Sequence, residues 1–202
     1  MQELDFSILY ALQNLHMPVL NETMIVITLL GNAGILWILL TLLALFSKKH
    51  RQLGIRMAAA IIFTAVIACL IVKNLVQRDR PCWIDSSIVM LIRIPEDFSF
   101  PSGHTTVSFA AALVIFRYRK LWGWIALAIA ALIAFSRMYL FVHFPTDVAA
   151  GLLIGLVGSL TADLLTCRLL PLLSARFPRL LGGEAMQKGP QEVPKSPRNN
   201  TV

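Results

Sequence analysis

The chain has 202 residues, of which 57% are hydrophobic and 14% charged, and its mean hydropathy is +0.71. Its length suits one domain, and its composition excludes an ordinary soluble protein in favour of a polytopic membrane protein. The net charge of +7 does not indicate nucleic-acid binding, because the basic residues are dispersed over short segments between apolar runs, where they orient a membrane protein.

The N-terminal segment predicts a short helix that lies in the membrane interface. Residues 4–17 have apolar side chains near helical spacing, with polar ones between them, and they are too few to span a bilayer. Glu3 and Asp5 stand where a secretory signal peptide carries Lys or Arg, so we expect no cleavable signal.

Five apolar runs follow and predict membrane-spanning helices, since a span needs about 20 apolar residues. The runs cover residues 24–46, 54–76, 102–117, 121–140 and 146–170. The third run is short and begins with polar residues, so its prediction depends on its neighbours. The fold class is therefore an all-α membrane helical bundle. Gly151, Gly155 and Gly158 lie near one face of the last helix, where small residues let helices pack closely.

The distribution of Lys and Arg orients the bundle. The larger basic set lies at residues 48–56 and 117–120 and from Arg168 onward, and it predicts the cytoplasmic side. The N-terminus, the 77–101 segment and the 141–146 turn then face outward. We expect residues 1–175 to form the membrane-embedded domain. Residues 176–202 cannot bury enough apolar area to fold and predict a disordered cytoplasmic tail.

Several residues with reactive side chains are interpreted as structural. Cys69, Cys82 and Cys167 do not make a disulfide framework, and we interpret them as packing residues. His16 and His50 have no partner residues in the sequence pattern and receive the same interpretation.

Three groups of polar residues interrupt the apolar runs, where each charge costs about 2.5–3.5 kcal/mol. They are Lys73 with Arg80-Pro81, then Pro101-Ser102-Gly103-His104, then Ser136-Arg137 with His143 and Asp147. Each residue alone has a simpler explanation, such as a membrane anchor for Arg137 or a favourable helix N-terminal charge for Asp147. Together they supply cations, two imidazoles and a carboxylate, which is the inventory that phosphate-ester chemistry needs.

The spacing of these residues resembles the signature of the type-2 phosphatidic acid phosphatase superfamily, K-x6-R-P, then P-S-G-H, then S-R-x5-H-x3-D. The resemblance covers residues 54–160 and fits without a gap. It implies a membrane lipid phosphatase that needs no metal and no other cofactor.

The catalytic roles follow from the chemistry, and the resemblance implies the same ones. His143 is the expected nucleophile, which forms a phosphohistidine that water then hydrolyses. Asp147 is expected to accept the other ring N–H of His143 and to stabilise the imidazolium. His104 is the expected general acid for the leaving oxygen and the base toward water.

The remaining motif residues are expected to bind phosphate. Lys73, Arg80 and Arg137 would hold the phosphoryl oxygens. Ser102 and Gly103 begin a helix, whose free backbone N–H groups favour an anion. Three further charged residues can either contact the substrate or only pair locally. They are Arg78, Asp79 and Arg93.

The outward orientation and the small membrane core favour a lipid substrate at the outer face of the plasma membrane. Small bacterial members of the family resemble undecaprenyl pyrophosphate phosphatases of the bacitracin-resistance type, so our first hypothesis is removal of one phosphate from a polyprenyl pyrophosphate. Phosphatidylglycerophosphate and phosphatidic acid are the alternative substrates. A non-enzymatic carrier or assembly protein with a vestigial phosphate site is the alternative of another class. The sequence predicts no oligomeric state.

Overall fold

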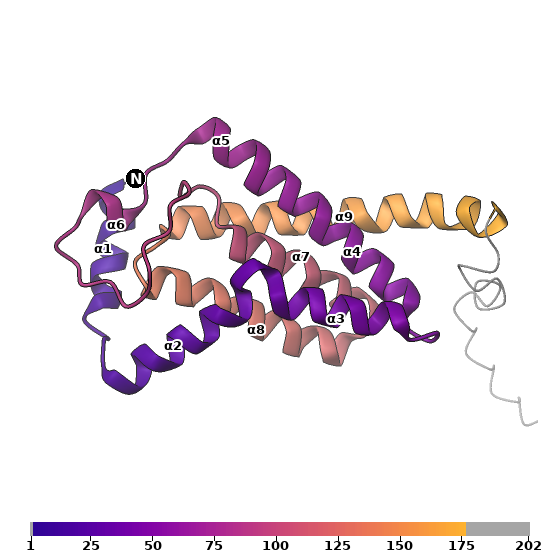
Figure 1. The fold of residues 1–202 in the computed structure, drawn as a ribbon, viewed down its shortest axis with the longest axis horizontal. Coiled ribbons are helices and arrows are strands. Elements are labelled where there is room, and N and C mark those ends of the chain that lie inside the picture. Colours follow the sequence, from indigo (N-terminus) through magenta and orange to yellow (C-terminus); the bar gives the residue numbers. More distant parts are fainter. Residues whose placement is uncertain (1, 177–202) are drawn as a thin grey trace, which may run out of the picture. The chain divides into compact units, whose positions relative to one another are not determined.

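All the regular secondary structure in the described part of the chain is helical (Figure 1). The computed structural model describes the backbone of residues 2–176 and the side chains of residues 2–169. Residues up to Thr166 form one compact unit, and a second begins at Cys167. The predicted all-α class is confirmed. The predicted disordered tail, residues 176–202, lies outside the described residues apart from Arg176.

The helices follow one another in a simple order. They are α1 Gln2–Gln13, α2 Pro18–Gly31, the 3-10 turn η1 Asn32–Gly34, α3 Ile35–Phe46, α4 Arg51–Ala65, the π-helical η2 Val66–Val72, α5 Lys73–Val76, α6 Pro81–Ile84, α7 Gly103–Tyr118, α8 Lys120–Tyr139 and α9 Pro145–Arg176. A core of buried apolar side chains from α3, α4, α7 and α8 lies around Trp37.

Four stretches of the described chain are long and apolar enough to cross a bilayer. They are Pro18–Phe46, Arg51–Ile84, Lys120–Tyr139 and Pro145–Leu169. The predicted third span, α7, is a helix of 16 residues, about 24 Å long against a hydrocarbon core of roughly 30 Å. Its Ala, Ser and Thr side chains let α8 and α4 pack closely around it, and eight of its 16 residues are buried. The structure therefore places four spanning stretches around a shorter central helix.

The first predicted span, 24–46, begins earlier and is interrupted. It starts at Pro18 and breaks at η1, where Ala33 and Gly34 have φ of 50° and 69°. These angles belong to the left-handed region, which residues with a Cβ avoid. The break turns the chain and presents Asn32 to the start of α7. The turn-prone residues Gly31-Asn32-Ala33-Gly34 lie at the break, but the apolar residues on both sides of them led to the prediction of one continuous span.

The N-terminal helix is shorter than the predicted 4–17 and packs against protein. It ends at Gln13, and both Asp5 and Leu9 on it are buried. A buried carboxylate is unusual on a helix that lies on a membrane surface, because burial of an unpaired charge is costly. Asp5 has partners, which are described below.

The glycines of α9 pack against the neighbouring helices, as predicted. A Cβ on Gly151 would lie 2.8 Å from the Ser102 carbonyl oxygen, and one on Gly155 would lie 2.7 Å from the Thr106 carbonyl oxygen. The same contact surface holds the backbone N–H of Ser102 3.1 Å from the Asp147 carbonyl oxygen. This close approach brings the P-S-G-H segment beside the first turn of α9.

Replacing Gly155 by alanine is expected to destabilise the protein by about 1–3 kcal/mol, because the new methyl group meets backbone atoms that cannot move aside. Thermal unfolding in detergent measures the effect. Leu153→Ala on the exposed face of the same helix is the control, and an unchanged melting temperature for Gly155→Ala would contradict the close packing.

Candidate active site

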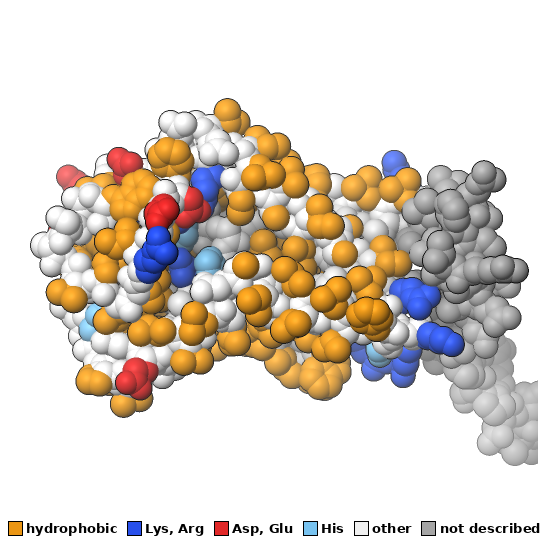
Figure 2. All heavy atoms as spheres, in the orientation of Figure 1, with side chains coloured by type: hydrophobic (Ala, Val, Ile, Leu, Met, Phe, Trp, Pro, Cys, Tyr) orange, Lys and Arg blue, Asp and Glu red, His pale blue; other side chains and the backbone are white. Residues whose placement is uncertain are grey.

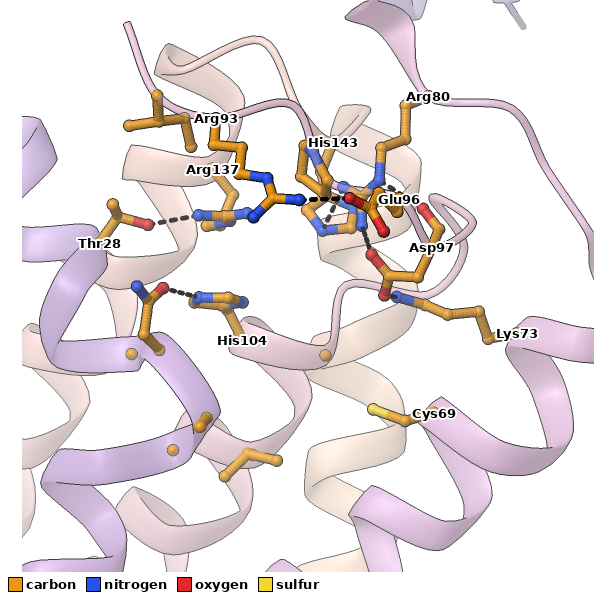
Figure 3. A pocket seen from close by; sticks show the side chains of 18 of the residues that line it. Thr28, Cys69, Lys73, Arg80, Arg93, Glu96, Asp97, His104, Arg137 and His143 are labelled. Atoms are coloured by element: carbon orange, nitrogen blue, oxygen red, sulfur yellow. Dashed lines mark hydrogen bonds and ion pairs between the residues drawn. The ribbon is translucent and has the colours of Figure 1, made fainter. Parts of the chain in front are cut away.

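A cavity of about 930 Å³ lies between η1, the η2–α5 junction, the start of α7 and the 92–97 segment (Figure 3). It is lined by six of the eight predicted site residues, namely Lys73, Arg80, Gly103, His104, Arg137 and His143. Figure 2 shows Lys, Arg and His side chains in a hollow on a mostly hydrophobic face. The two other predicted residues, Ser102 and Asp147, are buried but do not line the cavity.

His143 lies in the turn between α8 and α9 and is only 1% exposed. Its Nε2 is 3.2 Å from Nη1 of Arg80, which donates to it, and its Nδ1 is 3.6 Å from Oδ2 of Asp147. Nε2 therefore carries a lone pair and faces the cationic side of the cavity, while Nδ1 faces the carboxylate. This orientation suits a nucleophilic imidazole.

Asp147 holds its carboxylate through several donors. It accepts hydrogen bonds from Ser99 Oγ at 2.5 Å, from the Phe144 backbone N–H at 2.9 Å and from Arg78 Nη1 at 2.6 Å. The distance to His143 exceeds a direct hydrogen bond. Ser99 Oγ is 3.4 Å from Nδ1 of His143, so its hydroxyl links the imidazole to the carboxylate.

The surroundings of His143 favour its neutral form. Burial, followed by the positive charges of Arg80, Arg137 and Lys73, holds the pKa of His143 well below its usual range. If His143 attacks as a neutral base, the acid limb of the pH–rate profile is expected below pH 6.5, the ordinary value for histidine. Rates measured from pH 4 to 9 test this, and an acid limb above pH 7 would contradict it.

Two of the cations are engaged by a carboxylate from the loop. Asp97 forms an ion pair with Lys73, and its Oδ1 accepts from Arg80 Nη2 at 2.7 Å. Partial burial alone would raise the pKa of Asp97, but the two cations outweigh it and lower the value to about 2. Asp97 is therefore ionised, and its carboxylate lies where these cations would hold a phosphate.

Replacing Asp97 by asparagine is expected to strengthen phosphate binding, because a neutral amide competes less well for Lys73 and Arg80 than a carboxylate does. We expect the inhibition constant of inorganic phosphate to fall about threefold or more. Glu96→Gln, on the neighbouring exposed residue, is the control. Weaker phosphate binding by Asp97→Asn would show that the carboxylate supports the site instead of competing for it.

Arg137, near the end of α8, retains an unused donor. Its Nη1 donates to Thr28 Oγ1 at 2.5 Å, whereas its Nε is buried and has no hydrogen-bond partner among the described residues. A buried donor without a partner costs about 1–3 kcal/mol. A phosphoryl oxygen in the cavity would satisfy this donor.

His104 lies in the first turn of α7 and is held by Asn32 from the helix break. Its Nε2 is 2.9 Å from Asn32 Oδ1, and because an amide oxygen only accepts, Nε2 carries the proton. Gly103 lines the cavity, where a Cβ would lie 3.1 Å from Cys69 Sγ. Ser102 Oγ caps α7 by accepting from the Thr105 backbone N–H at 3.4 Å, and it also accepts from the Thr105 hydroxyl at 2.9 Å; the Ser102 side chain is buried and does not line the cavity.

Sequence reasoning missed residues that hold the motif residues in place. They are Asp5, Thr28, Asn32, Asp97 and Ser99. Of the residues with undecided roles, Arg78 contacts Asp147, while Arg93 lies at the cavity mouth and pairs with Glu96. No cluster of three or more His, Cys, Asp or Glu residues able to hold a metal occurs in the described part of the chain.

Comparison with known proteins relates this site to one family. Residues 52–165, which contain all three motifs, match the model of the PAP2 superfamily. The undecaprenyl-diphosphatase of Sulfolobus acidocaldarius is 31% identical over 157 residues, 76% of this chain and 75% of that one. YbjG of Escherichia coli, provisionally named an undecaprenyl-diphosphatase, is 36% identical over 117 residues, and the match covers 57% of this chain and 58% of YbjG.

A solved structure has the same fold. The transmembrane PAP2 type phosphatidylglycerolphosphate phosphatase of Bacillus subtilis superposes with a TM-score of 0.67 and 28% sequence identity, over 83% of this chain and 86% of that chain. The helices that carry the cavity therefore have a counterpart in a membrane phosphatase.

Proposed function

Because the chain belongs to the PAP2 superfamily and is a multi-pass membrane lipid phosphatase, we propose that it converts a polyprenyl diphosphate, undecaprenyl diphosphate, to the monophosphate. The observation that carries the chemistry is the convergence of two histidines and three cations on one cavity. The relatives named as undecaprenyl-diphosphatases support the choice of substrate.

The reaction proceeds in two steps. Nε2 of His143 attacks the terminal phosphorus, the bond to the bridging oxygen breaks, and His104, in its imidazolium form, gives a ring proton to that oxygen and becomes neutral. Water then attacks the phosphorus of the phosphohistidine while the neutral His104 takes a proton from the water. The bond between phosphorus and Nε2 of His143 breaks, and inorganic phosphate leaves. Asp147, through Ser99, stabilises the positive charge that His143 acquires.

The phosphate-binding groups surround the reacting centre. Lys73, Arg80 and Arg137 neutralise the charge that spreads over the three equatorial oxygens of the transferred phosphoryl group. The first turn of α7 adds its backbone N–H groups at Gly103. Leu29, Ala33 and Val107 also line the cavity and offer apolar surface to the first units of the lipid chain.

We place the site at the outer face of the plasma membrane, because the basic residues at the other end of the bundle favour the cytoplasm. A thiol probe that cannot cross membranes tests this side. In a background without native cysteines, Ser86→Cys should react in intact cells and Lys48→Cys only after lysis. The reverse pattern would place the site in the cytoplasm.

Dephosphorylation of phosphatidylglycerophosphate is the second candidate, favoured by the named activity of the Bacillus subtilis structure. A panel of undecaprenyl diphosphate, phosphatidylglycerophosphate and phosphatidic acid, with the purified protein in EDTA, decides between them. We expect the highest kcat/KM for undecaprenyl diphosphate. A tenfold higher kcat/KM for a glycerolipid would show that the glycerolipid, and not undecaprenyl diphosphate, is the substrate. No turnover of any of the three lipids would favour the carrier hypothesis.

A further inference from the structure

Arg78 lies outside the cavity yet contacts the carboxylate behind the nucleophile. Its Nη1 donates to Asp147 Oδ1 at 2.6 Å and to Thr146 Oγ1 at 2.7 Å, and its Nη2 donates to Asp5 Oδ2 at 2.8 Å. The guanidinium carbon lies 4.0 Å from the centre of the Phe144 ring. Arg78 does not line the cavity, so an effect on the reaction must pass through the residues that it contacts, of which Asp147 faces His143.

Asp5 brings the N-terminal helix to the same place. Its side chain is buried, and besides Arg78 it accepts from the Thr146 backbone N–H at 3.2 Å and from Thr146 Oγ1 at 2.7 Å. The first backbone N–H groups of a helix have no partner within the helix. Asp5 therefore satisfies a free donor of α9 in the turn that carries Asp147.

We propose that Arg78 and Asp5 form a positioning pair that orients Asp147 toward His143, which makes α1 part of the catalytic apparatus. Arg78 fixes Oδ1 of Asp147, and this leaves Oδ2 directed at Ser99 and at Nδ1 of His143. The inference rests on the roles proposed for His143 and Asp147, and it holds for whichever lipid phosphate is the substrate.

The charges of the pair explain why it has two members. Arg78 alone would neutralise Asp147 and weaken its support for the imidazolium of His143. With Asp5 included, the three groups carry a net charge of minus one, so a negative charge is kept beside His143 while the carboxylate is held in place. Burying two carboxylates is costly unless a cation is paired with them, and the partly buried Arg78 supplies that cation.

The decisive variants are Arg78→Ala and Asp5→Asn, and Tyr10→Phe is the matched control. Tyr10 also joins α1 to the rest of the protein, through Asp85 Oδ2 at 2.7 Å, but it has no contact with Asp147. We expect Arg78→Ala to lower kcat at least tenfold with KM within twofold, because it misorients the carboxylate without touching the phosphate. Asp5→Asn should have a smaller effect, and little further effect when added to Arg78→Ala.

The pH–rate profile separates positioning from a general loss of structure. The charged groups around His143 are Lys73 of α5, Arg80 before α6, Asp97 of the loop, His104 of α7, Arg137 of α8 and Asp147 of α9. Loss of the Arg78 cation leaves Asp147 less compensated, which raises the pKa of His143 and moves the acid limb to higher pH. Arg78→Lys keeps the charge and should restore the wild-type acid limb with only part of kcat.

Three results would overturn the positioning pair. One is a kcat of Arg78→Ala within twofold of wild type. Another is a rise in KM of Arg78→Ala with no change in kcat, which would indicate direct contact of Arg78 with the phosphate. The third is a loss in Tyr10→Phe equal to that in Asp5→Asn, which would reduce the pair to docking of α1. If Arg78→Ala does not fold, the kcat, KM and pH–rate profiles of Arg78→Lys and Asp5→Asn are compared with those of wild type instead. Full activity of His143→Ala would instead refute the proposed mechanism on which the pair rests.

Discussion

Replacing His143 by alanine is expected to abolish hydrolysis of lipid phosphates, with a loss on the order of 10³-fold or more. The buried imidazole has its lone pair on Nε2, beside Arg80 and within reach of the cavity, and its other nitrogen faces Asp147. Alanine removes the atom that forms the bond to phosphorus. Water would then have to attack the lipid phosphate directly, without the covalent intermediate.

Trapping of the intermediate distinguishes a lost nucleophile from a damaged fold. The wild-type enzyme, quenched in base after brief exposure to substrate labelled in the terminal phosphate, should carry a label that is stable in base and lost in acid. His143→Ala should carry none. His16→Ala is the control, because the His16 side chain contacts the Tyr139 carbonyl and ring and does not line the cavity. Label on His143→Ala, or a tenth of wild-type activity, would contradict the assignment.

The motif residues could be predicted from the sequence because their signals are local and ordered. Charged residues at membrane depth are costly, so Lys73, Arg80 and Arg137 were visible as exceptions in apolar runs. The structure brings them to one cavity together with both histidines. The spanning helices could be predicted because most of the apolar runs are about as long as a membrane span requires. The short α7 was the marginal case.

The residues that hold the motif in place could not be predicted, because their contacts depend on how distant segments fold together. Asn32 reaches His104 across 72 positions, and Asp5 reaches Arg78 across 73. Gly31 and Gly34 beside Asn32 mark a turn-prone point in the first apolar run, but no local pattern identifies His104 as the partner of Asn32 or Arg78 as the partner of Asp5. Ser102 is a related case: its place at a helix start predicts a phosphate contact, whereas in the structure its backbone N–H donates to the Asp147 carbonyl oxygen and its side chain caps α7.

Replacing His104 by glutamine is expected to slow hydrolysis by about 10²–10⁴-fold, the usual worth of a general acid or base. The size of the loss should depend on the leaving group. A glycerolipid monophosphate must release an alcohol oxygen, which leaves poorly without a proton because the pKa of an alcohol lies far above neutral pH. A diphosphate releases a phosphate group with a second pKa of about 6, which needs little help from a proton donor.

His104→Gln should therefore lose more on phosphatidic acid than on undecaprenyl diphosphate. With the diphosphate, the first step still proceeds, but the second step lacks the base that activates water, so phosphohistidine should accumulate. Asn32→Leu, which removes the acceptor of the His104 Nε2 proton, should shift both measurements in the same direction to a smaller extent. Equal losses on the two substrates without accumulation of phosphoenzyme would show that His104 binds phosphate and transfers no proton.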